Sequence, residues 1–225
     1  MLEPYIHLIQ KYPTSFLMDY CLLVSFLSGI INFRFMDSAN RAILGMIAVT
    51  LGIELVLIHY ASQGSNNHFL FSLISLVTVV GMGVAFTRGA VKASEKWSVG
   101  AIVAVYSLIF ASDFQWTRIV EHLLAIERLI LLGFVLLYFR RMITQMHVSN
   151  MLRHAMFWNC VGIILYASAS LFILLTIQFP FFNASLFNTK YEAYWLFAQW
   201  GAGFMYLVMG TAFWVRRVEV LETAI

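Results

Sequence analysis

The hydropathy pattern of this chain consists of long apolar runs separated by short polar segments. A helix needs roughly 20 residues to cross a hydrocarbon core of about 30 Å, and apolar runs of about this length recur along the sequence. The pattern predicts an all-α fold with seven transmembrane helices, at about 15–33, 42–61, 68–87, 97–111, 120–139, 155–179 and 194–215. Because no connection is long enough to fold alone, we expect residues 1–225 to form a single domain.

Composition strengthens the membrane interpretation. Hydrophobic residues make up 61% of the 225 residues and charged residues only 11%, which leaves too little polar surface for a water-soluble domain. We therefore expect a multi-pass integral membrane protein whose outer surface contacts the lipid bilayer. The first residues, MLEPYIHLIQKYP, lack the basic segment and apolar core of a cleaved signal peptide, so the first predicted helix is expected to direct membrane insertion.

The basic residues predict the orientation of the helices. Cytoplasmic connections of membrane proteins are enriched in Lys and Arg, so the N-terminus is expected outside and the C-terminus in the cytoplasm. The predicted cytoplasmic side carries Arg34, Arg41, Arg88, Lys92, Lys96, Arg140, Arg141, Arg153, Arg216 and Arg217, and the opposite side carries Lys11, Arg118 and Lys190. This asymmetry accounts for the net charge of +3, so we expect no nucleic-acid partner.

Charged residues inside the predicted helices are the first candidates for a functional site. At a rise of 1.5 Å per residue, Glu54, Glu127 and Arg128 each lie roughly 10–12 Å below the outer surface, in one layer. A central charge costs about 2.5–3.5 kcal/mol, so Arg128 needs a partner. We expect Glu54, because it matches Arg128 in depth and has no partner on its own helix, whereas Glu127 is turned by about 100° from Arg128. Glu121, on nearly the same face as Arg128, is the alternative, and a structural and a functional role of the pair both stay open.

Other polar residues are expected above this layer, nearer the outer surface. Together they predict a polar cavity in the outer half of the bundle, lined by Glu54, Glu127, Arg128, Glu121, Asp19, His59 and His122. His59, His68 and His122 are the candidates for metal ligands, with Asp19, Asp113 or Glu121 beside them. They form no HxxxH or HExxH pair on one helix, so we expect neither a metal site nor another cofactor.

Other sequence features restrict the function. The three prolines lie outside the predicted helices, which argues against the broken helices of many transporters. The chain contains no Ser–His–Asp order, glycine-rich loop or CxxC motif, and the last predicted helix has no lysine for a retinal Schiff base. Several glycines inside the predicted helices are expected at close helix contacts; these are Gly81, Gly83, Gly201, Gly203 and Gly210.

Three stretches of the chain resemble a known group of proteins. The run NNHFLFSLISL, the acidic fifth predicted helix and the run FWNCVGIILYASASLFI look like uncharacterised seven-helix membrane proteins that are common in Bacteroidota. The resemblance implies a location in a bacterial inner membrane and no established activity. The layout also resembles small sugar transporters of three, one and three helices, although their proline-glutamine-type motif is absent.

Two functions follow as hypotheses. The first is a receptor-like or sensory membrane module, which binds a small ligand or protons in the polar outer cavity and signals to a cytoplasmic or membrane protein partner. The alternative is a small-molecule transporter or an intramembrane enzyme that uses the layer of Glu54, Glu127 and Arg128. The absence of proline breaks and catalytic motifs favours the first. The sequence leaves open whether the protein forms a homo-oligomer.

Overall fold

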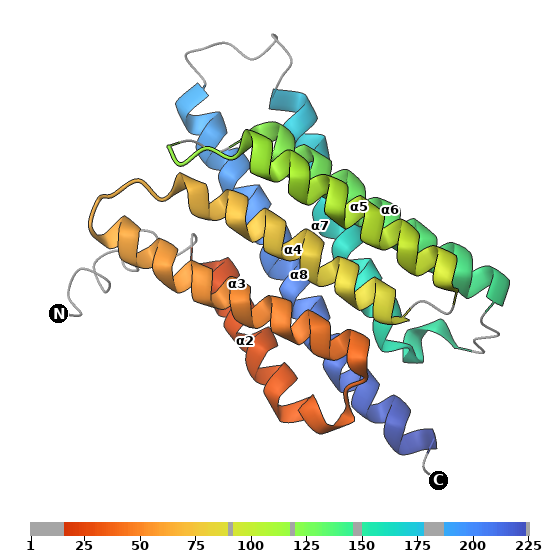
Figure 1. Cartoon of the computed structure of the whole chain (residues 1–225). Coiled ribbons are helices and arrows are strands. Elements are labelled where there is room, and N and C mark those ends of the chain that lie inside the picture. Colours follow the sequence, from red (N-terminus) through yellow and green to blue (C-terminus); the bar gives the residue numbers. More distant parts are fainter. Residues whose placement is uncertain (1–15, 90–91, 118–119, 146–149, 178–186, 224–225) are drawn as a thin grey trace.

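The computed structural model describes residues 16–89, 92–117, 120–145, 150–177 and 187–223, with side chains except at 121, 145 and 173–197. Within these ranges the chain forms seven α-helices, two short 3-10 helices and no β-strand (Figure 1). The α-helices are α2 (Leu17–Asn32), α3 (Ser38–Ser62), α4 (His68–Gly89), α5 (Ala93–Asp113), α6 (Glu121–Gln145), α7 (Ala155–Ile177) and α8 (Phe187–Thr223); the 3-10 helices are η1 (Phe33–Phe35) and η2 (Met151–Arg153). The predicted all-α fold class is therefore confirmed.

Five helical segments are long and apolar enough to cross a membrane. They are Leu17–Phe35, Ser38–Ser62, His68–Gly89, His122–Thr144 and Ala155–Phe172. Helices α5 and α8 are not among them. Helix α5 carries charged residues at both ends, and the side chains of α8 before residue 198 lie outside the described part of the structure. The chain is thus a helical protein with several candidate membrane spans, and the seven-span count and the orientation stay predictions.

Six of the helices form a closed ring. Each packs against the next in the order α2, α3, α4, α6, α7 and α8, and α8 closes the ring by packing on α2. Helix α5 lies outside this ring, where it packs against α4 and α6 (Figure 1). Residues from all six ring helices therefore face one shared interior.

Large apolar side chains lie on the exposed surface of the bundle as well as in its interior. Ile47, Met82 and Phe134 are fully buried in the core, whereas Leu108 and Leu136 are 72% and 68% exposed. Polar side chains such as those of Ser25, Thr50 and Asn159 are fully buried between the helices. Buried polar groups and outward-facing apolar side chains are the arrangement expected of helices surrounded by lipid. The surface is therefore consistent with bilayer contact.

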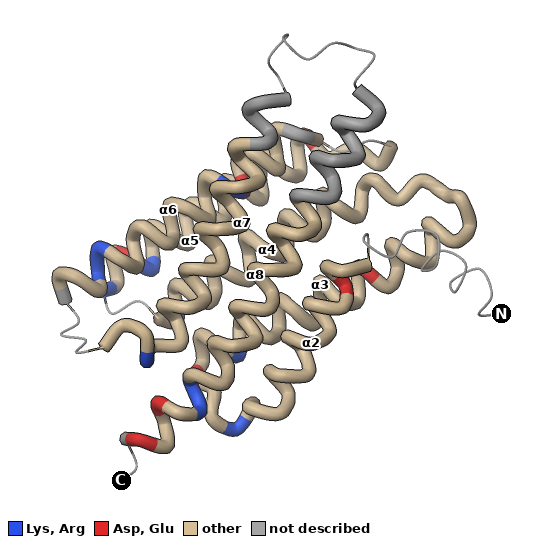
Figure 2. The backbone as a smooth tube through the Cα atoms, turned by 180° about the vertical axis from the view of Figure 1, so that it is seen from behind, with Lys and Arg blue, Asp and Glu red and all other residues tan. Residues whose placement is uncertain are grey.

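Lysine and arginine gather at one end of the bundle, as Figure 2 shows. Helices α2, α4, α6 and α8 end there, and α3, α5 and α7 begin there. We call this the basic end. It carries Arg34, Arg41, Arg88, Lys92, Lys96, Arg140, Arg141, Arg153, Arg216 and Arg217.

Candidate functional site

A small cavity lies inside the ring, in the half away from the basic end. Its volume is about 80 Å³, and residues of all six ring helices line it. We call it the acidic cavity. Its polar lining consists of Glu54, Ser75, Glu127, Arg128, Tyr166, Ser170, Gln199 and Tyr206.

Arg128 is held in this cavity by partners on α6 and α7. It forms an ion pair with Glu127, and both side chains are almost completely buried. Its Nε donates a hydrogen bond of 3.0 Å to Ser170 Oγ, which donates to the carbonyl oxygen of Tyr166 at 2.6 Å. The guanidinium carbon lies 4.3 Å from the centre of the Tyr166 ring, within the range of a cation–π interaction. The Arg128 charge is therefore neutralised by Glu127 on α6, and the guanidinium group is positioned by Ser170 and Tyr166 on α7.

The predicted pairing of Arg128 with Glu54 is wrong. The ion pair that the structure shows joins Arg128 to Glu127, its neighbour in the chain. On an ideal helix the Cβ directions of Glu127 and Arg128 differ by about 100°, which does not exclude contact between their side chains. Arg and Glu side chains are long and flexible enough to bend toward each other across this angle. The three residues nevertheless line one cavity, at a common depth in the bundle.

Glu54 is the acidic residue of this cavity that Arg128 does not neutralise. It lies on α3 and is only 3% exposed. Among the described side chains, Glu54 takes part in no ion pair, and its Oε1 has no hydrogen-bond partner. Asp19 Oδ1 on α2 is also buried without a hydrogen-bond partner among the described residues. The cavity thus has an excess of carboxylate over guanidinium groups.

The three predicted histidines lie apart from the acidic cavity. All are exposed: His59 is near the end of α3, where its Nε2 lies 3.0 Å from Gln63 Nε2, and His68 begins α4. Within the described residues, no group of three or more His, Cys, Asp or Glu side chains is placed to hold a metal ion. The Glu121 side chain is outside the described part of the structure.

His122 pairs with Asp113 at the surface, where α5 ends and α6 begins. The His122 Nε2 lies 2.9 Å from Asp113 Oδ2, and the Ser112 hydroxyl donates to Asp113 Oδ1 at 3.1 Å. The hydrogen bond with His122 is the main cause that lowers the pKa of the Asp113 carboxyl below its usual value, and that from Ser112 adds to it. This pair belongs to the α5–α6 connection and not to the predicted polar cavity.

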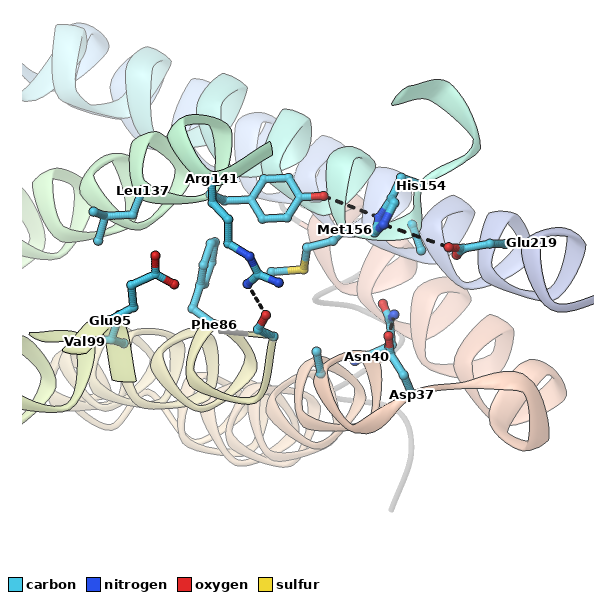
Figure 3. Close-up of a pocket in the computed structure, with 14 residues that line it drawn as sticks. Asp37, Asn40, Phe86, Glu95, Val99, Leu137, Arg141, His154, Met156 and Glu219 are labelled. Atoms are coloured by element: carbon cyan, nitrogen blue, oxygen red, sulfur yellow. Dashed lines mark hydrogen bonds and ion pairs between the residues drawn. The ribbon is translucent and has the colours of Figure 1, made fainter. Parts of the chain in front are cut away.

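A second cavity, of about 170 Å³, opens at the basic end (Figure 3). In it Arg141 extends from α6 and donates to the carbonyl oxygen of Gly89 at the end of α4. On the other side the Tyr138 hydroxyl lies 3.4 Å from His154 Nδ1, and His154 Nε2 lies 3.9 Å from Glu219 on α8. Arg141 thus links α6 to the end of α4, and His154, just before α7, lies between Tyr138 on α6 and Glu219 on α8.

Sequence reasoning missed this second cavity. The basic residues at this end were interpreted only as signals of orientation. The available signal was that acidic residues lie among them: Glu219 accepts from Arg216 at 2.8 Å, and Arg216 lies 3.9 Å from Asp37. Acids spaced among these arginines indicate ion pairs within and between the helix ends, which orientation alone does not require.

Comparison with known proteins finds no family model, no curated protein and no solved structure that matches this chain. The resemblance to seven-helix proteins of Bacteroidota stays a prediction. Function must therefore be argued from the geometry of the two ends of the bundle.

Proposed function

We propose that the protein is a receptor-like sensory membrane module that takes up a proton or a small cation in the acidic cavity. The observation that carries this proposal is Glu54, a buried carboxylate that lines the cavity without an ion-pair partner among the described side chains. In a bilayer an uncompensated charge at this depth costs about 2.5–3.5 kcal/mol. Glu54 is therefore the group whose charge state is most easily changed by an arriving proton or cation.

The size of the cavity favours a very small occupant. One water takes up about 30 Å³ of liquid volume, so a cavity of about 80 Å³ has room for a few waters or an ion. Pockets for drug-sized ligands run from about 300 to 1,000 Å³. The volume thus supports a proton or small cation and gives no support to a sugar-sized substrate.

The helices that line the cavity also meet at the basic end, which supports a signalling role. Glu54 is on α3, and Tyr206 is on α8. The start of α3 and the end of α8 approach each other through Asp37 Oδ2 and Arg216 Nε, which lie 3.9 Å apart. A shift of α3 against α8 on protonation of Glu54 would change this contact, and a partner protein at the basic end would sense it.

The proposal is tested by infrared difference spectroscopy of the protein in lipid nanodiscs across a pH titration. We expect a carboxyl band from a buried, titrating glutamic acid that disappears in Glu54→Gln. Glu95→Gln removes a carboxyl group from the basic end and is expected to leave the band in place. A band that survives in Glu54→Gln would refute the assignment.

A flux assay separates a sensor from a carrier. Liposomes that contain the protein are given a proton or sodium gradient, and the decay of the gradient is compared with that of empty liposomes. A sensor leaves the decay unchanged. Faster decay that Glu54→Gln abolishes would show that the cavity transports the ion.

A further inference from the structure

A third pocket lies at the basic end, between the start of α5 and the last turns of α6. Its volume is about 500 Å³, within the range of about 300–1,000 Å³ typical of small-molecule sites. We call it the α5–α6 pocket. It adjoins the cavity of Figure 3, because Glu95, Leu137 and Arg141 line both.

The charged side chains of the α5–α6 pocket are mostly cationic. Lys92, Arg140 and Arg141 line it, with Glu95 as the acidic residue among the lining side chains. Within the described part of the chain, neither Lys92 nor Arg140 forms an ion pair with an acid. Arg141 is fixed by its hydrogen bond to Gly89, and its Nε is buried without a described hydrogen-bond partner. Among the described lining residues, three cationic side chains therefore face one carboxylate, which leaves an excess of positive charge.

The backbone of α5 adds to this preference for an anion. The first hydrogen bond of the helix runs from the Lys96 amide to the Lys92 carbonyl, and the Lys92 side chain caps no amide. The amides of the first turn, which includes the lining residues Ser94 and Glu95, thus have no partner within the helix. The positive end of the α5 helix dipole lies at this first turn, beside the pocket.

The surface around the pocket has the character expected of a site for a lipid headgroup. Trp97 and Ile143, one turn from the lining residues, are 80% and 77% exposed, and Leu136 is 68% exposed. Apolar side chains thus continue along α5 and α6 from the cationic pocket. Basic pockets between helices at a cytoplasmic membrane surface suit anionic lipid headgroups.

We infer that the α5–α6 pocket binds a phosphate group, carried by an anionic phospholipid whose acyl chains lie along α5 and α6. Arg140 and Lys92 contact the phosphate oxygens, and Arg141 is positioned beside them by Gly89. This site is separate from the acidic cavity and does not depend on the function proposed for it.

Lipid binding is tested on the whole protein in detergent by native mass spectrometry with added phosphatidylglycerol. One tightly bound lipid per chain is expected. In Lys92→Gln with Arg140→Gln the affinity should fall about 25-fold, since each surface cation contributes roughly a factor of five. Arg141 is left unchanged because it also holds α4. Arg140→Lys keeps the charge and should retain most of the affinity.

The matched control is Arg34→Gln with Arg217→Gln, which removes the same charge at the same end. These two arginines stack on Phe35 and do not line the pocket. Equal loss of affinity in the control pair, or no saturable binding by the wild-type protein, would overturn the inference. Phosphatidylcholine should not compete. Competition by inorganic phosphate at millimolar concentration would instead assign the site to a soluble phosphate and exclude the lipid as its source.

Discussion

At the scale of single residues, Glu54 and Arg128 are the informative pair because they share a cavity and differ in their partners. Arg128 has an ion pair with Glu127, a hydrogen bond to Ser170 and the face of Tyr166. Glu54 has no ion pair among the described side chains. One charge is thus fixed by the fold, and the other is available for a change of protonation or for a bound cation.

The partner of Arg128 can be identified by a double-mutant cycle. Arg128→Leu leaves Glu127 buried and unpaired, which should lower the free energy of unfolding by about 3–5 kcal/mol. Adding Glu127→Leu should restore most of this loss, whereas adding Glu54→Leu should restore much less. The free energy of unfolding of every variant is measured in mixed micelles by circular dichroism. Stronger rescue by Glu54→Leu would contradict the pairing.

At the scale of helices, glycine permits a close contact between α3 and α4. A Cβ built on Gly81 would lie 2.6 Å from the Cβ of Met46, a distance that side chains do not tolerate. Met46 Cβ is attached directly to the backbone of α3, so the two helices would have to move apart. The expectation that Gly81 lies at a close helix contact therefore holds in the structure.

Gly81→Ala should destabilise the protein by about 1–3 kcal/mol, the usual cost of overpacking. Gly52→Ala is the matched control on α3, because no atom lies within 4 Å of the added Cβ. This variant should gain about 0.5–1 kcal/mol, since alanine loses less backbone freedom than glycine in a helix. Thermal unfolding in detergent measures the change in stability of each variant, and the two changes should have opposite signs. A stabilising Gly81→Ala would show that α3 and α4 are not in close contact.

Helix positions were more predictable from sequence than side-chain contacts. The span predicted at 68–87 lies within α4, and that at 42–61 lies within α3. The span predicted at 97–111 was shorter than α5, which runs from Ala93 to Asp113, because apolar length marks the membrane core and helices continue into polar surroundings. The Glu127 contact and the basic-end cavities depend on side-chain conformation and on packing between distant segments, which periodicity does not encode.

At the scale of the whole molecule, the basic end predicts orientation in the membrane. We expect it to face the cytoplasm, with the α3–α4 connection outside. Cys21 and Cys160, the natural cysteines, are buried and free, so a single added cysteine can be labelled selectively. Gln63→Cys should react with an impermeant maleimide in intact cells, and Lys96→Cys only after the membrane is opened; both positions are exposed. The reverse pattern of labelling would invert the topology.

The position of Glu127 next to Arg128 has a consequence for biogenesis. Both partners belong to α6, so their ion pair can form before this helix meets any neighbour. We expect the segment to enter the lipid with these two charges already neutralising each other, which lowers the cost of insertion. With a partner on α3, the charge of Arg128 would stay unpaired in the bilayer until α6 had packed near α3. A partner on the same helix lets α6 leave the translocon alone.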